Sequence, residues 1–253
     1  MIEFDALDIS ILGPALVVGT LVLATHAPLG RQVIQRGIIF IDLAIAQIAG
    51  LGVLAAMYFG FEIHSWPLQL FAIGSALLAT LIFAWCETHW PKYQESIIGI
   101  SFILAATAAL IIVSKDPHGS EHLNEILAGQ ILWTTWDQVL ILAIATSILL
   151  ILMKLMPINR HRISFYVIFS VSITISVQFI GVYLVFASLI IPALASINYS
   201  DKNNHLYTWL LGVTAYFIGL ASSALFDLPS GPTIVWALAL TALSQRLITR
   251  RLS

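Results

Sequence analysis

The sequence predicts an all-α fold, that of a polytopic helical membrane protein. Of its 253 residues, 59% are hydrophobic and only 9% are charged, and the mean hydropathy is +0.96. A soluble domain carries about 25% charged residues, so this chain has too few to cover a surface in water. Apolar stretches of about 20 residues, the length that crosses a bilayer as a helix, recur along the chain. We therefore expect one transmembrane domain, residues 1–253, with about eight to nine spans.

The apolar stretches predict nine spans when each is bounded by polar or turn residues. Their ranges are 9–25, 38–59, 67–86, 96–114, 136–155, 164–181, 183–197, 206–226 and 229–247. The seventh stretch is short and contains Pro192, so it is the one expected to cross only in part. Several Trp and Tyr residues lie near span ends, where aromatic rings prefer the boundary between membrane and water.

The basic residues predict the orientation of the chain, because short loops rich in Lys and Arg stay in the cytoplasm. With nine spans and an external N-terminus, only Lys115 of the 11 Lys and Arg residues falls outside. The others, all predicted to be cytoplasmic, are Arg31, Arg36, Lys92, Lys154, Arg160, Arg162, Lys202, Arg246, Arg250 and Arg251.

Other function classes lack their sequence signatures. There is no P-loop pattern G-x-x-x-x-G-K-[ST], so the chain is not expected to hydrolyse ATP. No basic aromatic patch suggests binding to nucleic acid, and no Ser-His-Asp spacing suggests a hydrolase. The lone cysteine, Cys86, excludes an internal disulfide and a C-x-x-C metal site. We therefore expect that the chain is not an enzyme and has no cofactor of its own.

Five stretches carry a resemblance to a known family. In chain order they are PLGRQVIQRGIIFIDLAIAQIAGLG, QESIIGISFILAATAALIIVS, LNEILAGQILWTTWDQ, QFIGVYLVFASLIIPALAS and FDLPSGPTIVWALALTAL. Together they resemble the membrane subunits of zinc and manganese importers of the ATP-binding-cassette class (ABC-3 type). The resemblance implies a type II importer-like permease that forms a homodimer in the cell (inner) membrane. It also implies a cytoplasmic ATPase and an external solute-binding protein as partners, and Zn²⁺ or Mn²⁺ as the transported cation.

The chain departs from the family pattern at two places. The family's second helix usually carries Asp and His four residues apart, next to Pro-Gly. Here Leu43 and Gln47 stand at those two positions, Asp42 lies one residue early, and Leu51 replaces the proline. The second departure is the cytoplasmic stretch MPINRHRIS, which is shorter than the family's coupling segment.

Asp42 is the first candidate metal residue, because an ionisable group in a membrane helix often marks an ion path. It shares a helical face with Ala46 and Gly50, small residues that allow helices to approach closely. Two interpretations are open: Asp42 lines the cation path, or, at the inner end of the helix, it pairs with Arg36 or caps a neighbouring helix. Gln47 is a second candidate for lining the path, although an amide binds Zn²⁺ less tightly than an imidazole.

The stretch HGSEH supplies three further candidate metal residues, His118, Glu121 and His122. The pattern H-x-x-E-H occurs in zinc-protease helices. Here it lies in a short loop and contains Gly119, so an intramembrane protease is the less favoured interpretation. On an external loop the three side chains are either a transient site for an arriving cation or ordinary solvated residues.

Other cargoes and mechanisms are open for the same fold. The missing family histidine favours, as an alternative cargo, a metal chelate or an organic cofactor. A secondary cation transporter, which needs no ATPase, is a further alternative. The histidines outside the HGSEH stretch, His26 among them, are expected at span ends near the membrane surface and show no metal-binding spacing.

Overall fold

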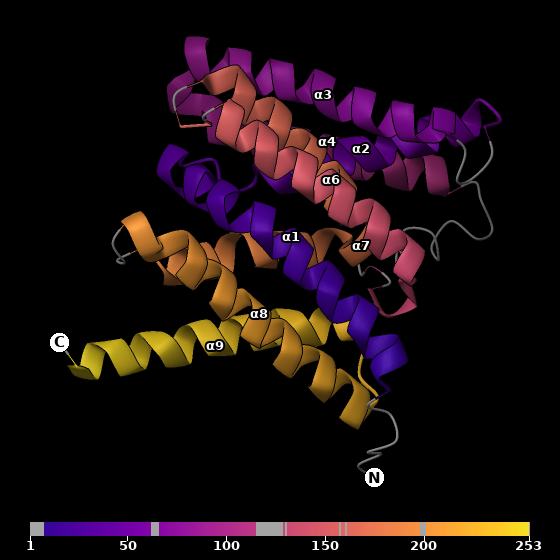
Figure 1. Cartoon of the computed structure of the whole chain (residues 1–253). Coiled ribbons are helices and arrows are strands. Elements are labelled where there is room, and N and C mark those ends of the chain that lie inside the picture. Colours follow the sequence, from indigo (N-terminus) through magenta and orange to yellow (C-terminus); the bar gives the residue numbers. More distant parts are fainter. Residues whose placement is uncertain are drawn as a thin grey trace.

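The computed structural model describes residues 8–61, 66–114, 129, 131–156, 158–159, 161–197 and 201–252, with the backbone alone for 201–204 and 248–252. This part of the chain is a helical bundle without strands (Figure 1), so the predicted all-α fold is confirmed. In chain order its helices are α1 (Ile9–Arg36), α2 (Ile41–Tyr58), α3 (Trp66–His89), α4 (Gln94–Val113), α6 (Trp136–Leu155), α7 (Arg162–Ala195), α8 (Asp201–Phe226) and α9 (Ser230–Leu252). Two short 3-10 helices, η2 (Pro91–Tyr93) and η3 (Ile131–Trp133), precede α4 and α6.

The count of nine spans is too high. Within the described residues, seven helical segments are long and apolar enough to cross a membrane. The predicted spans 164–181 and 183–197 both lie in α7, whose last 14 or so residues extend only ~21 Å, less than the ~30 Å hydrocarbon layer. The predicted span 229–247 forms α9, which is not among the seven because polar residues from Ser244 onward lower its hydropathy.

Both ends of α1 are defined by local hydrogen bonds. The Asp8 side chain accepts a hydrogen bond from the Ser10 backbone N–H at 2.8 Å and so caps the first turn. At the other end, Gly37 has a φ of 68° and its N–H points to the carbonyl groups of Val33 and Ile34. Glycine adopts this left-handed conformation without a steric penalty, so the helix ends there. Between these ends α1 packs against α6, α7 and α8.

α7 reverses its direction at Gly181, the one residue inside it with non-helical angles (φ 77°, ψ 164°). In the first arm, Ser172 bonds Thr25 of α1 at 3.1 Å and Phe165 lies 4.5 Å beneath the Arg36 guanidinium, so this arm runs antiparallel to α1. The Leu189 carbonyl nevertheless packs against Gly30. A straight helix would carry Leu189 ~25 Å beyond Ser172, away from Gly30. The second arm therefore folds back along α1.

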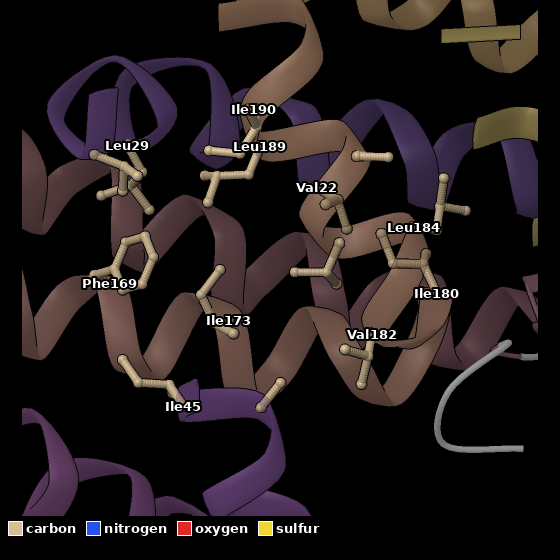
Figure 2. Packing of buried hydrophobic residues seen from close by; sticks show 14 of the residues in the cluster. Val22, Leu29, Ile45, Phe169, Ile173, Ile180, Val182, Leu184, Leu189 and Ile190 are labelled. Atoms are coloured by element: carbon tan, nitrogen blue, oxygen red, sulfur yellow. The ribbon is translucent and has the colours of Figure 1, made fainter. Parts of the chain in front are cut away.

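Close backbone packing fixes the position of this reversal. Gly129, with a φ of 71°, lies so near the backbone of Ile180 and Gly181 that a side chain there would collide with it. Figure 2 shows core side chains from both arms, including Phe169 and Leu189, in one cluster with Leu29 of α1. The boundary predicted between the sixth and seventh spans thus coincides with a real bend.

α1 and α7 connect two groups of helices. On one side, α2 packs against α3 and α4, and both α2 and α3 contact α7. On the other side, α8 and α9 pack together, with α8 against α1 and α9 against α7 (Figure 1). The two helices between the groups therefore bring side chains of α2, α7 and α9 near one another.

We predict that Gly181→Ala destabilises the protein. The backbone conformation of Gly181 is one that side chains disfavour, at a cost of about 1–3 kcal/mol. Thermal unfolding of the purified chain in detergent measures this loss. Gly74→Ala in α3 is the matched control, because no atom lies within 4 Å of the added methyl group. Equal melting temperatures for the two variants would contradict the assigned strain.

Candidate functional site

Asp42 lies in the first turn of α2 and is buried, with 1% of its surface exposed. Neither of its carboxylate oxygens has a hydrogen-bond partner among the described residues. A second carboxylate lies close by, because Glu95 at the start of α4 accepts a hydrogen bond at 3.2 Å from the backbone N–H of Phe40, two residues before Asp42. The helix dipole favours negative charge at this end of α2. The inner end of α2 therefore carries two carboxyl groups close together, and that of Asp42 has no basic partner among the described residues.

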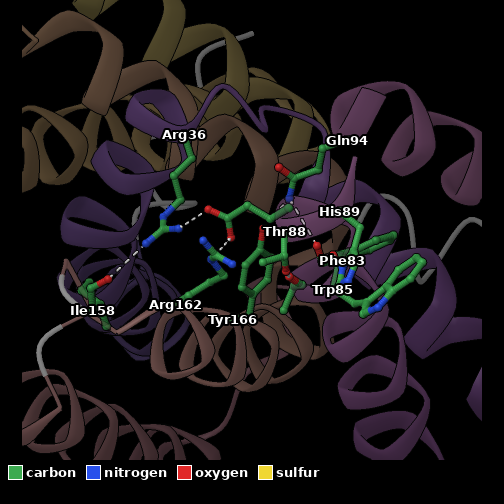
Figure 3. Close-up of polar contacts among 11 residues, drawn as sticks. Arg36, Phe83, Trp85, Thr88, His89, Gln94, Ile158, Arg162 and Tyr166 are labelled. Atoms are coloured by element: carbon green, nitrogen blue, oxygen red, sulfur yellow. Dashed lines mark hydrogen bonds and ion pairs between the residues drawn. The ribbon is translucent and has the colours of Figure 1, made fainter. Parts of the chain in front are cut away.

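The predicted alternative partner of Asp42 is bound elsewhere. Arg36 contacts Glu87 of α3 at 2.8 Å and donates to the carbonyl of Ile158 at 3.4 Å (Figure 3). Its guanidinium also lies over the ring of Phe165. The expected pair of Asp42 with Arg36 is thus wrong for this conformation. Glu87, which is 51 residues away in sequence, already satisfies the arginine. The pairing with Arg36 is therefore excluded here, and the role of Asp42 in a cation path stays a prediction.

Glu87 joins three helices at this end of the bundle. Its second oxygen lies 3.1 Å from Nε of Arg162, the first residue of α7. The two arginines were both predicted to be cytoplasmic, and the structure brings them to one carboxylate. Nearby, Arg31, Lys154 and His205 line a cavity of about 480 Å³. The charge-based prediction that these residues share one side of the membrane agrees with their positions.

Gln47 lies beside a second cavity, which we call the α2 cavity. Its volume is about 600 Å³. Its lining residues come from α2, α4, the second arm of α7, and α9: Leu43, Gln47, Phe102, Ala106, Leu110, Val182, Tyr183, Phe186, Ala187, Ile191, Pro232, Val235 and Trp236. Leu43 and Gln47, four residues apart and so on one face of α2, both face this space. These are the two positions at which the resembling family carries Asp and His.

The chemistry of the α2 cavity is almost wholly apolar. The side-chain polar groups among its lining residues are the Gln47 amide, the Tyr183 hydroxyl and the Trp236 indole N–H. Zinc is held by nitrogen, sulfur or carboxylate ligands, and a neutral amide is a weak substitute. Asp42 is offset by one residue, about 100° around the helix, and is absent from the lining. This subunit therefore offers a passing cation little direct coordination inside the cavity.

The remaining metal candidates are not tested by the structure. His118, Glu121 and His122 lie outside the described residues, so their arrangement stays a prediction. Across the described ranges, no three His, Cys, Asp or Glu side chains are close enough together to hold a metal ion. Cys86 is buried, and the carboxylate next to it in sequence, Glu87, is bound by arginines, so no soft metal site forms there.

His26 is the polar residue that the sequence analysis misplaced. It was expected at a span end, but α1 continues to Arg36 and leaves His26 inside the bundle with no exposed surface. Its Nδ1 lies 3.2 Å from the Thr25 hydroxyl, which is bonded in turn by Ser172. Its Nε2 has no partner among the described residues. α1 continues through Pro28 to Arg36, and this continuation places His26 in the interior of the bundle.

The fold defines a class of protein, a multi-pass helical membrane protein. Family comparison then assigns the particular group. The model of the ABC 3 transport family matches residues 8–248, nearly the whole chain, and the protein belongs to this family.

Similar proteins from bacteria agree with this assignment. The chain is 23% identical to a probable metal transport system membrane protein of Chlamydia trachomatis, over 81% of this chain and 78% of that one. It is 23% identical to the high-affinity zinc uptake system membrane protein ZnuB of Haemophilus influenzae, over 89% and 92% of the two chains. A solved structure of PsaBC from Streptococcus pneumoniae has the same fold, with a TM-score of 0.75, 22% identity and coverage of 92% and 90%.

We predict opposite effects on stability for two acidic residues at the inner end. Asp42→Asn removes a buried charge without a bonded partner, so the free energy of unfolding should stay within about 1 kcal/mol of wild type or rise. Glu87→Gln should cost about 1–3 kcal/mol, less than a fully buried ion pair because its side chain keeps 19% exposure. Thermal unfolding in detergent compares the two variants. A larger loss in Asp42→Asn than in Glu87→Gln would mean that Asp42 has a bound partner.

Proposed function

We propose that this chain is the membrane permease of an ATP-driven importer of divalent metal cations, Zn²⁺ or Mn²⁺. The family match over residues 8–248 carries the proposal, and relatives named for metal and zinc transport support the choice of cargo. The permease works as a homodimer in the inner membrane. A separate cytoplasmic ATPase supplies the energy, and an external solute-binding protein delivers the cation.

Transport follows from alternating access to the α2 cavity. ATP binding and hydrolysis on the partner switch the permease between a state open to the outside and a state open to the cytoplasm. The Gln47 amide holds a cation only weakly and the Leu43 side chain offers no ligand, which favours passage over trapping. Asp42 and Glu95, at the inner end of α2, provide negative charge that draws the cation toward the cytoplasm. On the external side, His118, Glu121 and His122 receive the cation from the binding protein.

The apolar lining favours a second candidate cargo, a metal chelate or an organic cofactor. Such a cargo brings its own ligands and presents an apolar surface, which suits a cavity of about 600 Å³ with few polar groups. Uptake of free Zn²⁺ and Mn²⁺ is therefore measured beside Fe-chelate and cobalamin, in a strain lacking its own zinc importer. Import of the chelate or cobalamin with no import of free cations would select the second candidate.

Uptake should require ATP hydrolysis on the partner. This chain contains no nucleotide-binding motif, so a hydrolysis-dead mutation in the ATPase should abolish accumulation of radioactive zinc or manganese. As a control, expression of the ATPase variant and its assembly with the permease are compared with those of the wild-type ATPase and should be unchanged. Full uptake in the hydrolysis-dead background would instead indicate a secondary transporter.

Gln47→His should tighten metal binding in the α2 cavity. Zinc prefers imidazole to an amide, so the apparent affinity for Zn²⁺ should rise about tenfold and release should slow. Equilibrium binding to the purified permease and single-turnover uptake in proteoliposomes measure the two effects. The control is Leu110→His, which places a histidine in the same cavity on α4 instead of at the family position on α2. Unchanged affinity in Gln47→His would place the cation route away from α2.

A further inference from the structure

The cavity of about 480 Å³ that Arg31, Lys154 and His205 line is here called the basic cavity. The three residues come from α1, α6 and α8, and α1 packs against both of the other helices. No acidic residue is among the described residues that line it. Arg31 and His205 have further contacts of their own, whereas no described side chain bonds the Lys154 ammonium. Such an excess of one charge favours an anion in the basic cavity and disfavours a cation.

Two side-chain amides add hydrogen-bond donors to the basic cavity. Gln35 and Asn159 both line it, and both are exposed. The Gln32 amide donates to Oε1 of Gln35 at 3.1 Å, which leaves the NH2 group of Gln35 to donate to another acceptor. A phosphate group combines negative charge with several acceptor oxygens, so it binds ammonium, guanidinium and amide donors together. The polar part of the lining therefore fits a phosphate group.

The rest of the lining places the basic cavity beside the lipid. Leu150 and Met153 of α6 also line it, and Leu150 belongs to an exposed apolar face of this helix that continues to Leu155. α6 begins at the exposed Trp136, and Lys154 lies in its last turn. The rise between these two residues is ~27 Å, close to the ~30 Å hydrocarbon layer. With Trp136 at the outer boundary, Lys154 reaches the headgroups of the inner leaflet.

We propose that the basic cavity binds the phosphate group of an anionic phospholipid from the cytoplasmic leaflet. Arg31 and Lys154 contact the phosphate, and Gln35 and Asn159 donate hydrogen bonds to its oxygens. An acyl chain leaves the cavity past Leu150 and lies along the apolar face of α6. A net negative headgroup is preferred to a zwitterionic one, because basic residues between membrane helices on this side attract anionic lipids. The site is separate from the α2 cavity, with which it shares no lining residue.

The test titrates the full-length permease, purified in detergent and freed of lipid, with phosphatidylglycerol and with phosphatidylcholine. Native mass spectrometry counts the bound lipid and gives the dissociation constants. Lys154→Gln should weaken phosphatidylglycerol binding about fivefold, and Asn159→Asp, which adds a negative charge to the lining, by about as much. Both residues are exposed, so the variants should fold normally. Lys92→Gln is the matched control, since it removes an exposed charge from the side predicted to be cytoplasmic, outside the basic cavity, and should leave the affinity unchanged.

Three results would overturn the inference. Equal losses in Lys154→Gln and Lys92→Gln would show a general surface charge effect and no defined site. Equal affinity of wild type for phosphatidylglycerol and phosphatidylcholine would remove the preference for an anionic headgroup. Displacement of phosphatidylglycerol by inorganic phosphate alone would assign the basic cavity to a soluble phosphate and exclude the lipid. The titrations contain no metal, ATP or partner chain, so their outcome is independent of the proposed transport function.

Discussion

The reversal of α7 at Gly181 is the constraint on which the rest of the bundle depends. It allows one helix to line α1 twice, with Phe169 on the outgoing arm and Leu189 on the returning arm, so that the core closes around α1. It also places Val182 and Phe186 against α2, where they form a wall of the α2 cavity. Only glycine tolerates the required backbone angles, and only glycine at position 129 leaves room for the turn. The wall of the cavity that α7 forms thus depends on the close packing of Gly129 against Gly181.

Two acidic residues at the inner end of the bundle, Glu87 and Asp42, lie in different surroundings. Glu87 is held by two guanidinium groups, so its charge serves the connection between helices. Asp42 is more deeply buried and has no bonded base among the described residues. An uncompensated carboxylate in a membrane helix is costly, and the fold gains no ion pair in return. The cation path proposed above would give this carboxylate a role that the fold itself does not supply.

Much of the fold follows from periodicity and charge alone. Helical class, most span positions and the bend near residue 182 were predictable, because membrane helices must be long, apolar and bounded by polar or turn residues. Pairing between helices was not predictable. Arg36 was assigned to Asp42, its neighbour in sequence, whereas its partner lies 51 residues away on α3. His26 was expected near the membrane surface because the first span was predicted to end at residue 25, whereas α1 continues to Arg36. The sequence showed only that the two family positions, Leu43 and Gln47, are four residues apart. It did not show that they face a cavity.

That spacing constrains how a cation crosses. Leu43 and Gln47 face the cavity, whereas Asp42 points about 100° away from Leu43 and about 140° away from Gln47. An acid at position 42 instead of position 43 is therefore absent from the cavity lining, although both positions lie in the first turn of α2. On the route proposed above, a cation in the cavity keeps much of its water, shares ligands with a second subunit, or arrives with ligands of its own. We therefore expect such a route to bind the cargo loosely in the cavity and to select it before the cavity, where the cargo is delivered.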